Sequence, residues 1–598
     1  MSLMQQAYDT YNYAEKKYAG VYFADKKEPL APIGHWITNA AIEITINGDG
    51  KFLAASSVGA ENEKTLFPVT ENSTSRTSTS AAEHPHPLCD QLQFFMHEDL
   101  IRYPHYIEQL EMWAESDYSH PVIRAVLAYV KAGTIRKDLA DSALLKTNED
   151  GSIKNNKDFV RWIVNGIGDE SGPCWSNRNL HKAFTAWYST LQSSTEDYCM
   201  ITGEVSSPAK QHTKGVISHY GNAKIISAND NNGFTYRGRF LNDKEALNVS
   251  YNTSQKAHNA LRWVIANEGS CFGDRCFVCW NPQGRKLPEA TGIMARRSGI
   301  SEYSYTPSAY KQHMQEIITG WKSELPQDAK AVIAAFDAAT TGRLSVNYYS
   351  EMPAADFIER LGYWDETCCW YHDNFGIQSP TLYKIADYAF GTLQSNKFVA
   401  DNNVKKNILI QLLACRLEKA KMPLSIERAL VLHAGNMQIV PDDEKSKYLR
   451  RDLLFTTCAV IRKYYIDHFK EEWNMALEPE NKDRSYQFGR LMAILEKAEK
   501  DTYDSDDKRE TNIIRRQLAF VERPYSTTVS VLEQIKTAYY PQLSVASRKY
   551  YEMQIENIME ILSKDPVSLN RPLKDTYLLG YYLQKKNFYT SKKENMEE

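Results

Sequence analysis

Apolar side chains spaced three or four residues apart fill almost the whole sequence beyond residue 380. Proline-containing breaks such as Glu478-Pro479 and Arg523-Pro524 separate the periodic segments. Because an α-helix turns every 3.6 residues, this spacing gives each segment one apolar stripe that must be buried against a neighbour. We therefore expect residues 381–598 to form an α-helical bundle. The stripes include Ile408, Leu412 and Cys415; Leu453, Cys458, Ile461 and Tyr465; Phe488, Leu491, Met492 and Leu495; and Ile555, Ile558, Met559 and Leu562.

The first 380 residues carry both strand and helix signals. Residues 41–46 alternate apolar and polar side chains, and the turn Asn47-Gly48-Asp49-Gly50 joins them to 51–54, which predicts a β-hairpin. We expect an α+β chain, with a mixed α/β region over 1–380, which a break near residue 150 could divide in two, before the bundle. Other strand signals lie at 159–164, 217–226, 275–280 and 343–349, and helical spacing lies at 88–131, 179–191, 255–266 and 354–361.

The composition is that of a protein with nearly balanced charge. The chain has 71 basic and 75 acidic residues and a net charge of −4, whereas a protein that coats nucleic acid with its whole surface is usually basic. Any DNA contact would therefore use local patches or a larger assembly. No apolar run approaches the ~20 residues of a membrane span, and no secretory signal is visible, so we expect a cytoplasmic protein without a membrane partner. Ten cysteines are too few for a disulfide scaffold, and we expect reduced, buried thiols.

The usual motifs of an active site are missing from the sequence. We find neither a Walker-type phosphate loop nor a Gly-x-Ser-x-Gly nucleophile elbow. His84, His86 and Cys89 supply three metal ligands, whereas a structural zinc ion needs four. Cys271, Cys276 and Cys279 resemble a zinc knuckle, but the last two occupy a strand-like run whose odd spacing sends them to opposite faces. We therefore expect no metal and no other cofactor.

One dipeptide keeps a catalytic alternative open. His372-Asp373 is the HD pair found in metal-dependent phosphohydrolases and nucleases. Such a site needs further His and Asp ligands from neighbouring helices, and only His433 and His468 follow, without a partner carboxylate in a matching motif. We therefore expect no catalytic residue, and keep an HD-type phosphohydrolase or nuclease as the alternative. An interaction scaffold unrelated to nucleic acid is a weaker alternative.

The segment 68–80 is unusually polar. It holds nine Ser, Thr or Asn residues in thirteen, which predicts an exposed loop. Short polar side chains can bond to base edges and phosphates, and Asn72 is the leading base-reading candidate because its amide offers both a donor and an acceptor. A solvated connector is the simpler interpretation of the composition alone. The candidate DNA-binding residues of this segment are Asn72, Ser73, Thr74, Ser75, Arg76 and Thr77.

Basic residues gather in short clusters along the whole chain. Each cluster could contact the DNA backbone or a displaced strand, although a solvated helix face is the commoner origin of such pairs. The candidates are Lys210 and Lys214; Arg285 and Lys286; Arg296 and Arg297; Lys405 and Lys406; Arg450 and Arg451; Arg462 and Lys463; and Arg515 and Arg516.

Four stretches share their order with one known protein family and run from about residue 60 to about residue 525. They are residues 66–77 with 86–90, 199–204 with 214–216, 342–349 with 357–360 and 364–368, and 474–477 with 483–491. Together they resemble the large-subunit family of the type I-C CRISPR Cascade complex. Residues 231–236 depart from the family's pattern.

The resemblance implies a non-catalytic subunit of an RNA-guided antiviral complex, in which guide pairing reads the long sequence and the protein reads only a short motif. The mixed region would dock on the complex, recognise the protospacer-adjacent motif in duplex DNA and help unwind it. The resemblance thereby favours DNA binding by residues 72–77 over the solvated connector that composition alone suggests. The bundle, which resembles the Cascade small subunit, would stabilise the R-loop. Met475 and Met492 are available starts for a separately made small subunit. The implied partners are the crRNA-bound backbone subunits, the subunit capping the crRNA 5′ handle, small subunits, target DNA with its displaced strand, and a helicase–nuclease effector.

Overall fold

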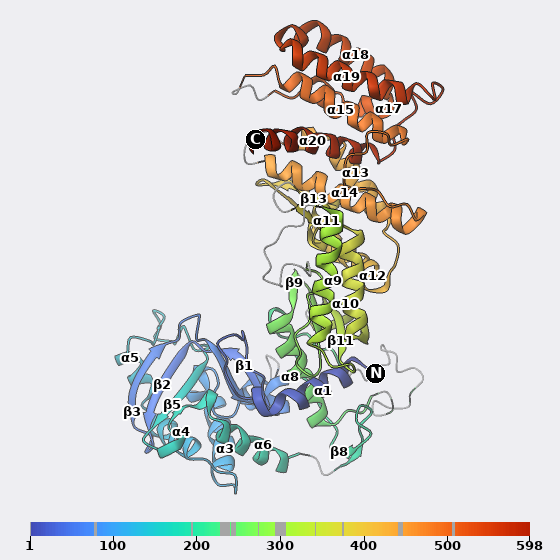
Figure 1. Ribbon diagram of the computed structural model, residues 1–598. Coiled ribbons are helices and arrows are strands. Elements are labelled where there is room, and N and C mark those ends of the chain that lie inside the picture. The colour runs from blue at the N-terminus through green and yellow to red at the C-terminus, as the bar shows by residue number, and fades with distance from the viewer. Residues whose placement is uncertain are drawn as a thin grey trace. The chain divides into compact units, whose positions relative to one another are not determined.

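The computed structural model divides into two compact units, whose elements are drawn in Figure 1. Unit 1 comprises Met1–Lys286 and Ala329–Met352, and unit 2 comprises Leu287–Asp328 and Pro353–Glu598. The structure describes residues 2–76, 80–192, 195–227, 240, 245, 247–272, 274–292, 306–340, 342–372, 376–440, 446–504 and 509–597.

One core of unit 1 forms around the predicted hairpin, which is confirmed. β2 (Ile42–Asn47) pairs antiparallel with β3 (Phe52–Ser57) and parallel with β5 (Val160–Asn165). Alternate side chains of β2, such as Ile44, are fully buried, because successive side chains of a strand point to opposite faces. Helices α3 (Arg102–Ala114), α4 (Pro121–Ala132) and α6 (Arg178–Thr190) contribute buried side chains to the same core, and Figure 1 shows α4 next to the strands.

The second core of unit 1 lies between a sheet of order β12-β11-β10-β9 and two helices. The strands predicted at 275–280 and 343–349 are confirmed as β10 and β12. The indole of Trp280 in β10 donates to the Thr10 hydroxyl at 3.0 Å and so ties the sheet to the first helix. The elements are α1 (Leu3–Tyr18), α8 (Tyr251–Glu268), β9 (Ser270–Phe272), β10 (Arg275–Trp280), β11 (Lys330–Thr340) and β12 (Arg343–Pro353).

Two expectations about unit 1 are wrong. Cys271 and Cys276 are not reduced thiols, because the antiparallel pairing of β9 with β10 sets them opposite each other and the structure joins them in a disulfide. That register is a tertiary fact that cysteine spacing alone does not reveal. Residues 217–226 form no strand. They contain a 3₁₀ helix at Ser218–Tyr220, after which the chain turns through the bond from Ala223 N to Tyr220 O, at 2.9 Å.

Unit 2 is mostly helical, which confirms the helices that the periodicity predicts beyond residue 380. Two short hairpins interrupt the helices, β13 (Trp370–His372) with β14 (Gly376–Gln378), and β15 (Thr392–Gln394) with β16 (Lys397–Val399). None of the described helices combines the length and apolar character needed to cross a membrane. The main helices are α9 (Pro307–Ser323), α10 (Ala354–Thr367), α11 (Leu382–Phe390), α12 (Asn402–Glu418), α13 (Leu424–Ala434), α14 (Lys447–Phe469), α15 (Arg484–Lys500), α16 (Asn512–Arg515), α17 (Gln517–Glu522), α18 (Pro524–Gln534), α19 (Val545–Leu562) and α20 (Tyr577–Glu597).

Two glycines allow α15 and α20 to approach closely. A Cβ atom at Gly489 in α15 would overlap the carbonyl oxygen of Tyr577, and one at Gly580 in α20 would overlap the carbonyl oxygen of Tyr486. The obstacle is backbone in both cases, and backbone cannot rotate away as a side chain can. Each helix therefore places a glycine directly against the main chain of the other helix.

We predict that Gly489→Ala lowers the free energy of unfolding by about 1–3 kcal/mol or more, because the added methyl group must push two helices apart. Gly320→Ala in α9 is the matched control, since a Cβ there meets no atom within 4 Å. Alanine in that open helical position should raise stability by up to ~1 kcal/mol. Chemical denaturation of both variants measures the difference, and equal stabilities would contradict the close contact.

Candidate nucleic-acid interface

The polar segment after β4 (Lys64–Pro68) is folded rather than looped out. Residues Glu71–Ser75 form the short helix α2, which begins with a reciprocal cap. Ser73 N donates to Thr70 Oγ1 at 3.1 Å, and Thr70 N donates to Ser73 Oγ at 2.9 Å. Ser73 is only 1% exposed. The expectation of an exposed loop is therefore wrong for this helix, because the hydroxyl groups satisfy the segment's own backbone.

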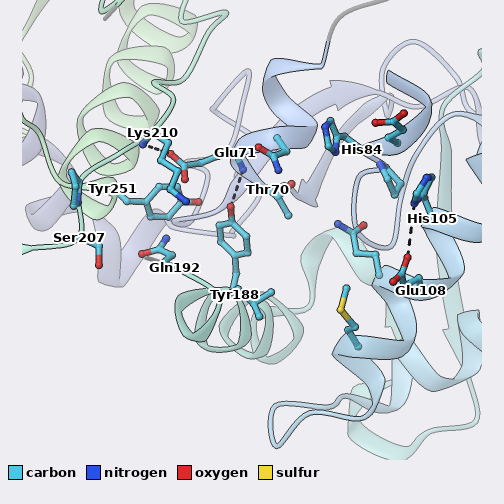
Figure 2. Close-up of a pocket in the computed structure, with 17 residues that line it drawn as sticks. Thr70, Glu71, His84, His105, Glu108, Tyr188, Gln192, Ser207, Lys210 and Tyr251 are labelled. Atoms are coloured by element: carbon cyan, nitrogen blue, oxygen red, sulfur yellow. Dashed lines mark hydrogen bonds and ion pairs between the residues drawn. The ribbon is translucent and has the colours of Figure 1, made fainter. Parts of the chain in front are cut away.

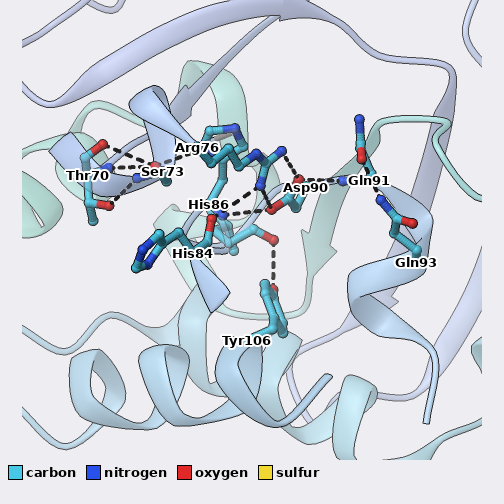
Figure 3. Close-up of polar contacts among 10 residues, drawn as sticks. Thr70, Ser73, Arg76, His84, His86, Asp90, Gln91, Gln93 and Tyr106 are labelled. Atoms are coloured by element: carbon cyan, nitrogen blue, oxygen red, sulfur yellow. Dashed lines mark hydrogen bonds and ion pairs between the residues drawn. The ribbon is translucent and has the colours of Figure 1, made fainter. Parts of the chain in front are cut away.

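A charged clamp holds the end of α2 (Figure 3). The Arg76 guanidinium donates two parallel bonds to the Asp90 carboxylate, each 2.8 Å long. The same carboxylate accepts the backbone N–H groups of His86 and Gln91, both at 2.7 Å, and is fully buried. Arg76 also lies over the Phe94 ring at 5.1 Å. Its charge is thus used inside the protein to fix the segment, which gives Arg76 a structural role.

Two of the three side chains considered as metal ligands at 84–89, those of His86 and Cys89, have other partners. His86 Nδ1 lies 2.8 Å from Ser73 Oγ, and burial lowers the pKa of His86 to about 3, so this imidazole is neutral at pH 7. Cys89 Sγ lies 3.7 Å from Cys174 Sγ. Across the part of the chain that the structure describes, no three His, Cys, Asp or Glu side chains gather into a metal-binding group.

Glu71 joins α2 to a second predicted DNA-binding cluster (Figure 2). Its carboxylate Oε1 accepts the backbone N–H groups of Lys210 and Gln211 at 2.8 and 2.9 Å. Its own N–H donates to the Tyr188 hydroxyl at 2.9 Å. Burial raises the pKa of Glu71, and the backbone donors oppose that rise. The structure therefore brings the polar segment and the Lys210–Lys214 cluster side by side.

Glu71 is absent from the residues predicted from the sequence because its role depends on a partner 139 residues away. One local signal was available. Thr70 followed by Glu71 and then Ser73 has the pattern of a helix N-terminus, in which a hydroxyl caps the helix and an acidic residue sits in the first turn.

A cavity of about 380 Å³ opens beside this junction. Asn72 is exposed and lines it, and its side-chain amide makes no hydrogen bond with another described residue. Aromatic rings, carboxylates and basic groups share the wall (Figure 2), which gives both stacking surfaces and polar partners. The other lining residues that Figure 2 labels are Thr70, Glu71, His84, His105, Glu108, Tyr188, Gln192, Ser207, Lys210 and Tyr251.

The remaining residues of the polar segment are only partly available. Thr74 Oγ1 and Ser75 Oγ both donate to the Glu71 carbonyl, at 2.9 and 2.8 Å. Thr77 lies outside the described residues, as do Arg296, Arg297 and the stretch 231–236. Lys210 is exposed, and Lys214 is half-buried.

Several basic pairs of unit 2 prove to be interior or ion-paired. Arg462 and Lys463 are 4% and 1% exposed, and Lys463 pairs with Asp467 at 2.6 Å. Side chains this buried have no surface to offer a phosphate, so their role is structural. Lys405 pairs with Asp387 at 2.6 Å, and Arg450 pairs with Glu510. The other described candidates divide into the exposed Arg285, Lys286 and Arg515 and the half-buried Lys406, Arg451 and Arg516.

The histidines near the HD pair do not converge. His372 Nε2 lies 2.8 Å from Asp452 Oδ1, and Asp373 lies outside the described residues. His433 Nδ1 bonds to the Tyr388 carbonyl at 2.7 Å, and His468 bonds to the Met422 carbonyl at 2.9 Å. These three rings therefore serve separate structural contacts, and the geometry does not favour the phosphohydrolase alternative.

A protein-family model described as CRISPR-associated protein (Cas_Csd1) matches residues 8–589. The chain belongs to the Cas_Csd1 family. Membership confirms the resemblance found in the sequence, and makes the chain a CRISPR-associated protein of the Cascade type and a component of a CRISPR-associated complex. No curated protein matches the sequence.

We predict that Arg76→Ala lowers the free energy of unfolding of this Cas_Csd1 protein by about 3–5 kcal/mol, because it leaves the buried Asp90 carboxylate without its positive partner. Arg76→Lys should restore only part of the loss, since an ammonium cannot make two parallel bonds. Arg136→Ala is the control, because Arg136 pairs with Glu98 on the surface and should contribute at most ~1 kcal/mol. Urea denaturation measures all three, and equal losses for Arg76→Ala and Arg136→Ala would contradict the clamp.

Several buried histidines make the stability of the folded chain depend on pH. Burial lowers the pKa of His86 and His212 to about 3 and of His35 and His258 to about 4. The unfolded chain binds these protons near pH 6.5, before the folded chain does, so stability falls as pH falls from about 6.5. Each such histidine contributes ~1.4 kcal/mol per pH unit in that range.

The measurement is urea unfolding of the protein and of its His86→Gln variant at several pH values between 7.5 and 5. The variant should lose less stability per pH unit than the wild-type protein does. The same pH slope in both proteins would show that His86 is not buried in its neutral form.

Proposed function

We propose that this protein is the non-catalytic large subunit of a type I-C Cascade complex, and that the face carrying α2 recognises the protospacer-adjacent motif in duplex DNA. The observation that carries the proposal is the position of Asn72. Its amide is exposed at a cavity, while the cap, the Arg76 clamp and the Glu71 bonds fix the helix that bears it. A fixed helix presents the amide from a defined position, so that only the side chain itself loses conformational freedom when it pairs with a base edge.

Charge supports the same division of labour. The protein as a whole is slightly acidic, so its duplex contact must be local, and other subunits must hold most of the guide and target. In this proposal the residues around α2 read the motif and help unwind the duplex. The helical bundle stabilises the R-loop and the displaced strand, and the exposed Arg515 is a candidate contact there.

Membership of a CRISPR-associated complex supports the partners that we propose. They are the crRNA-bound backbone subunits, the subunit at the crRNA 5′ handle, small subunits and a helicase–nuclease that the R-loop recruits. The chain contributes binding surfaces, and cleavage belongs to the recruited nuclease. The assembly would work on DNA in the cytoplasm.

We predict that Asn72→Ala in the assembled complex reduces the preference for motif-bearing over motif-lacking duplex by about 1–3 kcal/mol, or ~5–150-fold. Binding to duplex without the motif should change little, because phosphate contacts remain. Asn62→Ala is the control, since Asn62 is also an exposed asparagine of unit 1. Equilibrium binding with both duplexes, in the presence of Mg²⁺, measures the preference.

Two results would count against the proposal. Equal discrimination by Asn72→Ala and wild type would remove Asn72 from the recognition site. Cleavage of the duplex by the isolated chain would contradict a non-catalytic role, and its loss in His372→Ala would point to the phosphohydrolase alternative.

A further inference from the structure

Three chain segments align three cationic residues, and the segment that contains Lys214 is joined to α2 through the Glu71 bonds to Lys210 and Gln211. Lys214 and Lys224 are partners in an antiparallel bridge, and Lys224 and Arg343 are partners in a parallel one. The backbone bonds on either side of Lys224 run to Gly342 O at 3.2 Å and from Leu344 N at 2.9 Å. Residues paired across a bridge project from the same side of the backbone, with Cβ atoms roughly 5 Å apart. The three side chains therefore leave the fold as neighbours.

Neutral groups hold the two ammonium ions of this row. Lys214 Nζ donates to Asn222 Oδ1 at 3.2 Å, and Lys224 Nζ donates to Gln211 Oε1 at 3.0 Å. An amide oxygen can orient an ammonium group, but it does not neutralise the charge. Within the described residues, no carboxylate forms an ion pair with Lys214, Lys224 or Arg343.

The lowered pKa values of the two lysines show that this arrangement disfavours their charged forms. Both are half-buried, and burial lowers the pKa of each; Lys224 and Arg76 lower the pKa of Lys214 further. A half-buried cation without a counter-charge is destabilising. The neighbouring charges differ, because Arg76 is paired with Asp90 and Lys210 lies beside the Glu71 carboxylate. The uncompensated positive charge is concentrated on Lys214, Lys224 and Arg343.

We propose that Lys214, Lys224 and Arg343 form a binding site for the phosphodiester backbone of a nucleic acid, next to the helix that carries Asn72. The proposal rests on the proposed function and adds the contact that sets its register. Base readers need phosphate contacts that fix how the protein lies on the strand, and a row of cations beside a base-reading amide supplies them. Guide RNA and target duplex carry the same phosphodiester chemistry, so the experiment separates the two sources.

The test is the salt dependence of binding by the full chain, measured by fluorescence anisotropy. The variants are Lys214→Gln, Lys224→Gln and their combination, and Lys51→Gln, an exposed lysine of the β2–β3 turn, is the control. The probes are a DNA duplex without the motif and a single-stranded RNA. Each lost contact should reduce the slope of log K against log salt by ~0.9 on duplex DNA or by ~0.7 on a single strand.

On one of the two probes, the double variant should show a salt slope reduced by the equivalent of two phosphate contacts, and that probe identifies the nucleic acid that binds. Lys51→Gln should leave the slope unchanged. The melting temperature of the double variant should be unchanged or higher, because two repelling charges are gone. Unchanged slopes on both probes would overturn the site, as would a clear fall in melting temperature. Loss of assembly with the backbone subunits at an unchanged slope would also overturn it, in favour of a protein partner.

The two proposals fail separately. Unchanged slopes together with a motif preference that depends on Asn72 would remove only the cation row. A reduced slope in a complex whose motif preference ignores Asn72 would keep the phosphodiester site and remove α2 from base recognition.

Discussion

The Asp90 carboxylate, taken out of water and given four hydrogen bonds, organises the candidate interface. Two of its donors come from the Arg76 side chain and two from the backbone of His86 and Gln91. An ionised group buried to this degree is stable only when every lone pair finds a donor. The segments that supply those donors therefore cannot move independently, and they fix the position of α2, which Arg76 follows directly. Asn72 is held at the cavity by bonds in which its own side chain takes no part.

What the sequence could predict depends on how local each interaction is. The stripes of unit 2 and the β2–β3 hairpin follow from periodicity and turn residues within a few positions, and both are confirmed. Serine and threonine are ambiguous by composition, because the same hydroxyl groups serve a solvated loop or cap a helix. The partner of Glu71 lies 139 residues away, and Lys224 meets Arg343 only through tertiary pairing. Spacing along the chain carries no record of such pairs.

Charge gives a similar lesson at the level of the whole molecule. Counting basic pairs along the sequence treats Arg462, Lys463 and Arg515 alike, although the first two are interior and the third is exposed. Ion pairs such as Arg76 with Asp90 cancel in the local field, so the cations that matter for a polyanion are those left without an acidic neighbour. A protein with a net charge of −4 can thus present a small positive row on one face.

The glycine contact between α15 and α20 limits where a shorter product of the same coding sequence could begin. α15 spans Arg484–Lys500, and Gly489 is one of the positions at which α20 touches it most closely. A polypeptide started at Met475 keeps the whole of α15, including Gly489, which α20 packs against. One started at Met492 begins midway along α15 and lacks Gly489, so α20 would lose its close packing partner in the first half of that helix.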